Sequence, residues 1–270
     1  MMSLFGNIFG TSHGAEDIER LRYELEIAKS CQELGSDILF KYLEDKEKTD
    51  YWSGYEKPDP LVTVCVATYN RAKLLTERTI PSILEQSYKN IEVIVVGDCC
   101  SDETEKGMAA IDDARVKFVN LPERGKYPAD AYRRWMVAGT TPVNHALSMA
   151  KGDFITHLDD DDRYEACRIE SLLESAVKHR AEMVWHPFHL QNTRGKWKKH
   201  KAEKYATGQV TTSSVFYHSW LTRIKWNIEA HVFQEPGDWN RFRKFNYFGV
   251  KKVRNPYYLL WHYREHNQGG

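Results

Sequence analysis

Hydrophobic and polar positions follow two kinds of pattern through the middle of the chain. Short apolar runs rich in β-branched residues, typical of buried strands, occur at residues 61–70, 91–98, 116–121 and 153–158. A helical pattern lies between the first two runs, at residues 72–87, and Pro81 is expected to interrupt it. Buried strands that alternate with helices predict an α/β fold, a mostly parallel sheet flanked by helices.

The first part of the chain has the spacing of a helix. Residues 14–48 are charged, with apolar residues three or four positions apart, namely Ile18, Leu21, Leu25 and Ala28. This apolar stripe fits two arrangements: a coiled-coil seam that joins two copies in a homo-oligomer, or packing onto the chain's own domain. Pro58 and Pro60 then block regular structure. We therefore expect an N-terminal helical extension at residues 1–58.

The second half of the chain is marked by aromatic residues. Strand-like patterns rich in Trp, Tyr and His occur at residues 181–190, 208–220 and 253–264. The basic segment 194–204 is predicted to form a loop, either solvated or in contact with an anionic membrane or a lipid diphosphate. We expect a smaller β/α region at residues 166–270, beside the first half of the fold at residues 59–165.

The composition excludes several classes of protein. With 270 residues, 41% of them hydrophobic, the chain can form one large or two small domains. Lys and Arg together number 38, as do Asp and Glu, so the net charge gives no reason to expect a nucleic-acid partner. Five cysteines without CxxC spacing indicate neither a disulfide framework nor a zinc site.

The same patterns bear on localisation. No apolar run is long enough to cross a bilayer, and the first residues lack the basic start and long apolar centre of a signal peptide. We therefore expect a cytoplasmic protein. Attachment to a membrane surface stays open as an alternative, because the first ten residues include apolar side chains, namely Leu4, Phe5, Ile8 and Phe9.

Polar residues follow three of the predicted strands at the points where the strands end. They are Tyr69 and Asn70, Asp98, and the run Asp159–Asp162. The carboxyl ends of parallel strands meet at one edge of a sheet, so these residues are expected to converge on one crevice. Four adjacent carboxylates repel one another unless a positive group answers them. Either they cap a following helix near Arg168, or they bind a divalent cation.

Two longer segments place these residues in a wider pattern. They are "VCVATYNRAKLLTERTIPSILEQSYKNIEVIVVGDCCSDET" and "PVNHALSMAKGDFITHLDDDDRY". From about Leu61 to Val177 the chain resembles the nucleotide-sugar-binding half of the family 2 glycosyltransferases, which have the Rossmann-like GT-A fold. The resemblance implies a metal-dependent inverting enzyme that moves a sugar from a nucleoside-diphosphate sugar to a hydroxyl of a glycan or lipid-linked acceptor. A UDP-sugar is favoured as the donor over a dTDP- or GDP-sugar.

The resemblance also assigns roles to the acids. Asp159 and Asp161 match the acids that hold Mn²⁺ or Mg²⁺ against the donor diphosphate, with Asp161 as the direct ligand. Asp160 lies beside them at the donor, and Asp160 and Asp162 also remain candidate helix caps. Asp98 matches the acid that holds the base. A carboxylate only accepts hydrogen bonds, so it suits the N–H groups of uracil, thymine or guanine and disfavours cytosine.

Other positions are expected to line the donor pocket. Ala67, Tyr69 and Asn70 match the residues around the base, and Asn144 matches a residue under the phosphates. The residue before this Asn is often Arg in the family, but here it is Val143. A nearby stretch supplies basic side chains that are hypothetical replacements, namely Arg124, Lys126, Arg133 and Arg134.

The general base and the end of the chain carry the remaining predictions. Asp238 matches the family base, but Gly237 replaces the acid that usually precedes it, which leaves Glu235 as a rival. Tyr263, Arg264 and His266 match a Tyr-Arg-x-His motif, and His266 is predicted to touch the metal or the diphosphate. His262, Glu265 and His266 in the same stretch also spell HxxEH, a zinc-peptidase pattern, which we reject because that motif needs a long helix.

Two other functions remain open at this level. A non-catalytic protein that binds sugar nucleotides or glycans would keep Asp98 and Asp161 but lack the base. A sugar-nucleotide pyrophosphorylase would show a Gly-rich phosphate loop after the first strand, where this chain has "ATYNRAK".

Overall fold

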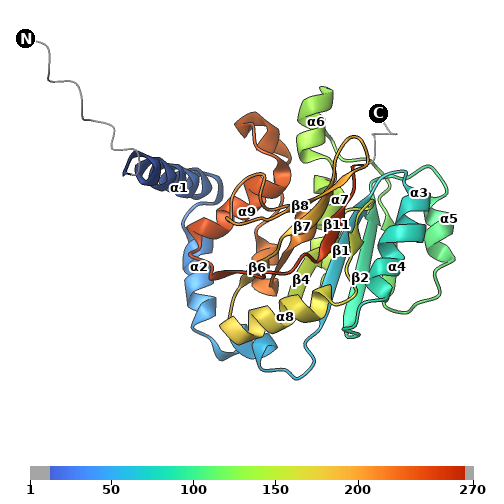
Figure 1. Ribbon diagram of the computed structural model, residues 1–270, viewed down its shortest axis with the longest axis horizontal. Helices are drawn as coiled ribbons and strands as arrows, with labels where there is room; N and C mark the ends of the chain where they lie inside the picture. The colour runs from blue at the N-terminus through green and yellow to red at the C-terminus, as the bar shows by residue number, and fades with distance from the viewer. Residues whose placement is uncertain (1–12, 265–270) are drawn as a thin grey trace, which may run out of the picture.

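The computed structural model describes residues 13–264, and its centre is a seven-stranded sheet in the order β10-β6-β9-β4-β1-β2-β3 (Figure 1). The four strands predicted in the first half are all present and run parallel to one another, namely β1 (Val62–Thr68), β2 (Ile91–Gly97), β3 (Val116–Asn120) and β4 (Phe154–His157). Every residue of β2 and β4 is buried, as their continuous apolar runs predict. The expected mostly parallel α/β sheet is therefore confirmed.

The second half of the chain completes this sheet. Strand β9 (Val215–His218) runs antiparallel between β4 and β6 (Met183–Trp185), and β10 (Lys252–Arg254) pairs with β6 at the edge. The predicted strand at 208–220 is therefore shorter than expected. The 3₁₀ turns η3 (Thr212–Ser214) and η4 (Ser219–Arg223) occupy its two ends.

A second, four-stranded sheet has the order β5-β11-β7-β8. Its strands are β5 (Arg163–Tyr164), β7 (Phe188–Gln191), β8 (Trp197–His200) and β11 (Leu260–His262). The single strand predicted at 181–190 is wrong, because the chain leaves the large sheet at His186 and Pro187, whose ring removes a ladder donor. The predicted loop at 194–204 is also partly wrong, because its middle forms β8.

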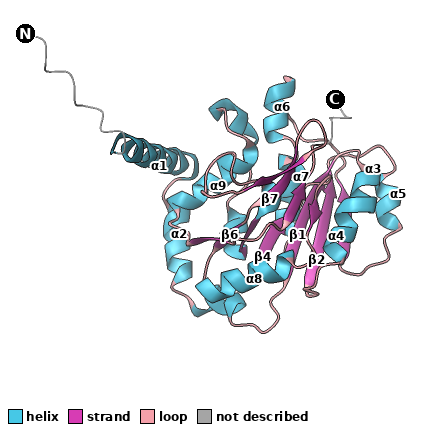
Figure 2. Cartoon of the chain, in the orientation of Figure 1, coloured by secondary structure: helices cyan, strands magenta, loops and turns pink. Residues whose placement is uncertain are grey.

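Helices cover both faces of the large sheet (Figure 2). The predicted helix at 72–87 forms as α3 (Ala72–Leu74), the π-helical turn η2 (Leu75–Thr79) and α4 (Ile80–Leu84). Its interruption therefore comes just before Pro81, which lacks the N–H that would continue the hydrogen-bond ladder. The other helices beside the sheets are α5 (Thr104–Ala109), α6 (Ala131–Val137), α7 (Thr140–Met149), α8 (Arg168–His179), η5 (Ile228–Phe233) and α9 (Gly237–Tyr247).

The N-terminal extension packs into the core of the fold. It contains α1 (His13–Leu34), α2 (Asp37–Lys46) and η1 (Thr49–Tyr55), and it buries Tyr42, Tyr51 and Tyr55 against the large sheet. The Tyr42 and Tyr51 hydroxyls donate to the fully buried Glu182, where Lys46 Nζ lies 2.7 Å away. No helix within residues 13–264 is both long enough and apolar enough to cross a membrane.

Helix α1 contacts α9 through a polar face. Arg243 of α9 is fully buried and pairs with Glu33 of α1. The apolar stripe of α1 faces solvent instead, with Ile18, Leu21 and Leu25 each more than half exposed. Packing of this stripe onto the chain's own domain is therefore wrong. The coiled-coil alternative, and with it a homo-oligomer through α1, stays a prediction.

Candidate active site

A cleft of about 1090 Å³ opens beyond the carboxyl ends of the parallel strands. Its lining includes Arg71, just before α3, and Trp135 of α6, two helices that are labelled in Figure 1. The residues predicted from the sequence that line it are Ala67, Tyr69, Asp98, Asp159, Asp160, Asp161 and Asp238. The polar strand ends therefore converge on one crevice. Tyr263 and Arg264 line the same cleft, whereas His266 lies outside the described residues.

A tight turn after β1 sets the direction of the neighbouring side chains. Asn70 has φ 52°, in the left-handed region that Asn tolerates better than most residues. Its Oδ1 accepts the backbone N–H of Ser101 at 2.8 Å, which ties this turn to the one after β2. Asn70 itself does not line the cleft, but Tyr69 and Arg71 on either side of it do. The structure thus gives Asn70 a supporting position.

Asp98 marks the far end of the cleft, after β2. Its side chain is 2% exposed, and its Oδ1 accepts the Gly125 N–H at 2.9 Å. The guanidinium of Arg124 lies 4.0 Å from the other oxygen and stacks 3.6 Å from the ring centre of Tyr69. The Tyr127 hydroxyl, also in the lining, is buried and has no hydrogen-bond partner in the described structure. These groups can hold a planar polar ring.

The acid run does not cap a helix. Helix α8 begins at Arg168 with Cys167 as its cap, beyond strand β5. The fully buried Asp162 instead accepts His262 Nδ1 at 2.8 Å and the Tyr263 N–H at 2.9 Å. The capping interpretation of Asp160 and Asp162 is therefore wrong. Asp162 joins the acid run to β11.

Arginine side chains form ion pairs and hydrogen bonds with the other acids of the run. Arg71 Nη1 pairs with the Asp161 carboxylate and lies 3.6 Å from Asp160. Arg78, on the π-helical turn, donates to the Asp161 carbonyl at 2.9 Å and stacks 3.8 Å from the ring centre of Tyr263. Burial raises the pKa of Asp160 to about 7, although Arg71 opposes the rise. The sequence offered a signal for Arg71, a basic residue two positions after Tyr69, but its pairing was not predicted.

Two acids of the run and the histidine that contacts them have the chemistry of a cation site. Ligand atoms of Asp159, Asp162 and His262 all lie within 4.8 Å of one another. Burial raises the pKa of Asp159 well above its ordinary value, and the neighbouring Asp162 and Asp161 add to the rise. Carboxylate oxygens suit Mg²⁺ and Mn²⁺, and a divalent ion would offset this repulsion. The residues therefore fit such an ion.

His262 was missed as a site residue. The sequence motif pointed to His266, four positions later. His262 lies on strand β11, so it is not on the helix that a zinc-peptidase motif requires. Burial opposes the charge on its ring, but contact with Asp162, together with the nearby Asp159 and Asp161, outweighs burial and raises the pKa of His262 to about 9. A charged imidazolium thus balances part of the acid run, and the ring would have to lose this proton before it could bind a cation.

The two candidate bases face different surroundings. Asp238 lies in the first turn of α9 and lines the cleft, and burial raises its pKa to about 6. Glu235 does not line the cleft, because its carboxylate accepts Arg243 Nε at 2.7 Å and the Asn240 amide at 3.0 Å. A Cβ on Gly237 would lie 3.2 Å from a backbone oxygen of α6, so this close approach disfavours the acid that the family usually has there.

The predicted phosphate residues divide into two groups. Of the four proposed replacements for the family Arg, Arg124 and Arg134 line the cleft, as does Val143 itself, whereas Lys126 and Arg133 do not. Asn144 does not line it either. Its side chain donates to the carbonyl of Trp226 and accepts the N–H of the same residue, both at 2.9 Å. Because Trp226 lines the cleft, Asn144 fixes one wall rather than facing the ligand space.

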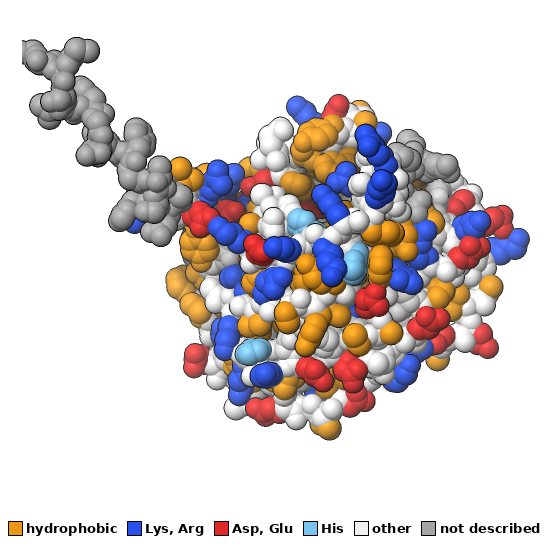
Figure 3. Space-filling view, viewed as in Figure 1, with side chains coloured by type: hydrophobic (Ala, Val, Ile, Leu, Met, Phe, Trp, Pro, Cys, Tyr) orange, Lys and Arg blue, Asp and Glu red, His pale blue; other side chains and the backbone are white. Residues whose placement is uncertain are grey.

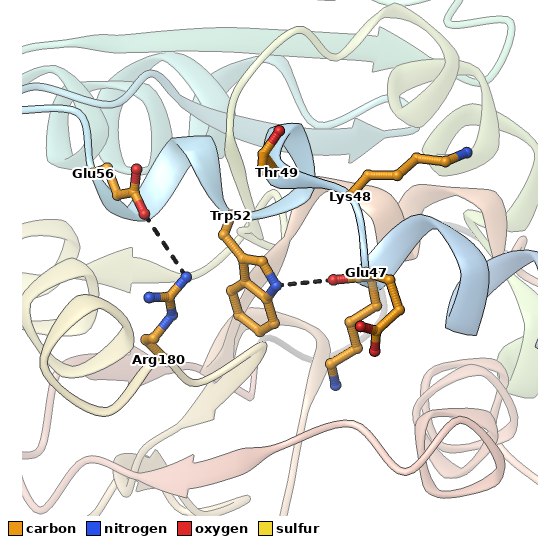
Figure 4. Close-up of a pocket in the computed structure, with 7 residues that line it drawn as sticks. Glu47, Lys48, Thr49, Trp52, Glu56 and Arg180 are labelled. Carbon is orange, nitrogen blue, oxygen red and sulfur yellow. Dashed lines mark hydrogen bonds and ion pairs between the residues drawn. The ribbon is translucent and has the colours of Figure 1, made fainter.

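A second hollow, of about 400 Å³, lies between η1 and Arg180 (Figure 4). Arg180 stacks 4.7 Å from the Trp52 ring centre and lies 3.9 Å from Glu56. Lys46 and Lys48 are paired with acids as well. Its basic groups already have partners, so we assign no function to this hollow.

Comparison with known proteins agrees with this geometry. The model of the family described as "Glycosyl transferase family 2" matches residues 63–248. The chain is 30% identical over 139 residues to a putative colanic acid biosynthesis glycosyl transferase, WcaA, of Escherichia coli K12, covering 50% of this chain and 43% of that protein. It is 34% identical over 119 residues to a GalNAc(5)-diNAcBac-PP-undecaprenol β-1,3-glucosyltransferase of Campylobacter jejuni, covering 43% of this chain and 35% of that protein.

A solved structure shows the same fold. The crystal structure of residues 1–349 of TarS from S. aureus, in complex with UDP-GlcNAc, superposes with a TM-score of 0.58 at 16% identity, over 77% of this chain and 59% of that one. The GT-A fold expected from the sequence is therefore confirmed. The matched region spans less than half the length of the two curated relatives.

Proposed function

The chain belongs to glycosyl transferase family 2, and from this premise we propose that it transfers a sugar from a UDP-sugar to a hydroxyl of a glycan or lipid-linked acceptor, with inversion and with a divalent cation. The observation that carries the proposal is the convergence of Asp98, the acid run and Asp238 on one cleft. The C. jejuni relative is named for a lipid-linked acceptor, and the TarS structure contains UDP-GlcNAc, which supports both substrate classes.

The donor base would lie against Asp98 and Tyr69. Asp98 Oδ1 already accepts the Gly125 N–H, which leaves Oδ2 to accept the imide N–H of uracil. The unpartnered Tyr127 hydroxyl offers a further hydrogen bond in the same wall. The uracil N3–H needs an acceptor at the position where cytosine N3 needs a donor, so this wall favours UDP over CDP.

Asp159 and Asp161 would hold the cation, with Asp162 and His262 beside them. When bound, the ion would offset the charge that grows on the departing nucleoside diphosphate. Arg71 now pairs with Asp161, so it must leave that oxygen for the ion to reach it. Arg71 also lines the cleft, from which its guanidinium can turn to the donor phosphates.

Asp238 is the proposed general base. A base works best when its pKa lies near the working pH, and burial places the pKa of Asp238 at about 6, so the carboxylate is ionised at neutral pH. Glu235 is held by Arg243 and Asn240 outside the cleft, which argues against its role as the base.

The test is release of UDP, GDP or dTDP from a panel of donor sugars with and without Mn²⁺, followed by thermal-shift measurements with the free nucleotides. Asp238→Asn should lower turnover by about 10² to 10⁴-fold and keep donor binding. Glu235→Gln is the matched comparison, and it should keep most of the turnover. Near-normal turnover in Asp238→Asn, or no nucleotide binding in the wild type, would refute the proposal.

A further inference from the structure

An aromatic knob stands on one side of the mouth of the cleft. It consists of α6 and η5, which pack together through a small apolar cluster of Met136, Val137 and Ala230, separate from the main core. The exposed large apolar side chains of the knob are Tyr132 (62% exposed), Trp135 (61%), Val232 (61%) and Phe233 (38%). Their burial is not needed to hold the knob together. They are available to a partner.

A basic hairpin stands on another side of the mouth. It spans residues 188–201 and includes β7 and β8, with no acidic residue in this span. The ring of Trp197 packs 4.8 Å from those of Trp261 and Tyr263, which fixes β8 in place. The hairpin exposes five basic side chains, Arg194, Lys196, Lys198, Lys199 and Lys201. Among the described residues, only Lys201 of these five lies within ion-pair distance of a carboxylate.

The knob and the hairpin border the same opening. Trp135 of the knob and His200 of the hairpin both line the cleft. Hydrophobic side chains gather over α6, with Lys and Arg side chains beside them on the same face (Figure 3). A partner that touches both surfaces therefore covers the entrance through which an acceptor must come.

We propose that the aromatic knob and the basic hairpin dock the protein onto an anionic lipid bilayer, from which it takes a lipid-linked acceptor. This inference rests on the proposed function. Trp and Tyr favour the boundary between water and lipid, and Val and Phe insert below it. Unpaired Lys and Arg side chains are attracted to anionic headgroups. The acceptor sugar then reaches the cleft while its lipid tail stays in the bilayer.

The first experiment measures binding of the whole protein to vesicles by co-sedimentation. The vesicles are made of phosphatidylcholine alone or of phosphatidylcholine mixed with anionic phosphatidylglycerol. The hairpin variant Arg194→Gln/Lys196→Gln/Lys198→Gln should bind the anionic vesicles on the order of 100-fold more weakly, because each lost charge removes about 5-fold. The matched control Lys106→Gln/Lys178→Gln/Lys251→Gln loses the same charge from exposed positions outside the cleft and should bind like the wild type.

The second experiment tests the knob. Tyr132→Ser/Phe233→Ser should weaken binding to anionic vesicles by about 10-fold or more, because two apolar side chains no longer enter the lipid. Phe40→Ser/Leu43→Ser changes two exposed apolar residues on α2, which are at least as exposed as Tyr132 and Phe233 taken as a pair, and it should have no effect. The proposal is overturned if the wild type does not bind anionic vesicles, or if a control variant loses as much affinity for them as the hairpin or knob variant to which it is matched. It is also overturned if soluble polyglutamate binds as tightly and the knob variant has no effect, because a soluble polyanion would then be the partner.

Nucleotide binding separates this inference from the proposed function. The hairpin and knob variants should keep the thermal shift with UDP and Mn²⁺, because none of the substituted residues lines the cleft. Normal UDP binding with no vesicle binding overturns the docking surface alone. Absence of UDP binding in the wild type overturns the proposed function, whatever the vesicles show.

Discussion

Replacement of Asp238 by Asn should raise stability while it removes activity. Burial raises the pKa of Asp238 from an ordinary 3.8 to about 6, so the folded protein disfavours the ionised carboxylate. A group with a raised pKa stabilises the fold below its unfolded pKa and loses that contribution as the pH rises through its folded pKa. Above pH 6 the wild type therefore carries a cost that a neutral amide avoids. Asn still accepts the Trp239 N–H that Asp238 Oδ1 accepts at 2.6 Å.

The size of the effect follows from the two pKa values. Their difference is about 2, and each pKa unit corresponds to about 1.4 kcal/mol, which gives an upper bound of about 3 kcal/mol at pH 8. It is an upper bound because the side chain borders an open cleft that water enters. At pH 4 the same calculation gives a difference in unfolding free energy between the two proteins of about 0.5 kcal/mol.

Urea unfolding of both proteins at pH 4 and pH 8 measures this difference. We expect Asp238→Asn to be more stable at pH 8 by up to about 3 kcal/mol, and the gap to shrink at pH 4. Asp112→Asn, at an exposed position, is the control and should change stability by less than about 0.5 kcal/mol. A gap that is equal at both pH values, or a less stable variant at pH 8, would refute the reasoning.

Three further predictions concern the donor site, the cation and the helix interface. Asp98→Ala should weaken UDP binding in calorimetry by about 10- to 100-fold, because a hydrogen bond from uracil to a charged acceptor is lost. Unchanged affinity would mean that the uracil ring binds elsewhere. Arg71→Met should tighten Mn²⁺ binding on the order of 10-fold, because the ion no longer competes with a cation for Asp161; calorimetry with Mn²⁺ alone checks this, and weaker binding would contradict it. Arg243→Met should lower the free energy of unfolding by about 3 kcal/mol, since it removes the buried cation that Glu33 and Glu235 share, while Lys244 at 2.8 Å still pairs with Glu33. Arg20→Met breaks two ion pairs, with Asp17 and Glu24, that are both exposed, and it should cost less than about 1 kcal/mol.

The strands of the first half were predictable for a physical reason. A parallel strand buried on both faces needs apolar side chains at nearly every position, so β2 stands out as a nearly continuous apolar run. Strand β8 has no such signal, because three of its four side chains are exposed and it pairs through its backbone with β7. An edge strand of Trp and Lys residues therefore resembles a loop.

Contacts between distant residues set the limit of the sequence analysis. Asp162 and His262 are 100 positions apart, so no local pattern indicates that they share a hydrogen bond. The motif near the chain end pointed to His266 instead. The apolar stripe of α1 misled for a similar reason. The periodicity showed an apolar face, but the partner of the opposite face, Arg243, lies more than 200 residues away.

The buried carboxylate of Glu182 joins the N-terminal extension to the sheet. Its oxygens accept Tyr42, Tyr51 and Lys46 from the extension and the Lys251 N–H from the loop before β10. If the extension were removed, this charge would remain inside the fold without most of its donors. Helix α2 and the turn η1, which carry these donors, therefore do not form an independent module, and a graft of this catalytic unit onto another protein would have to keep both of them.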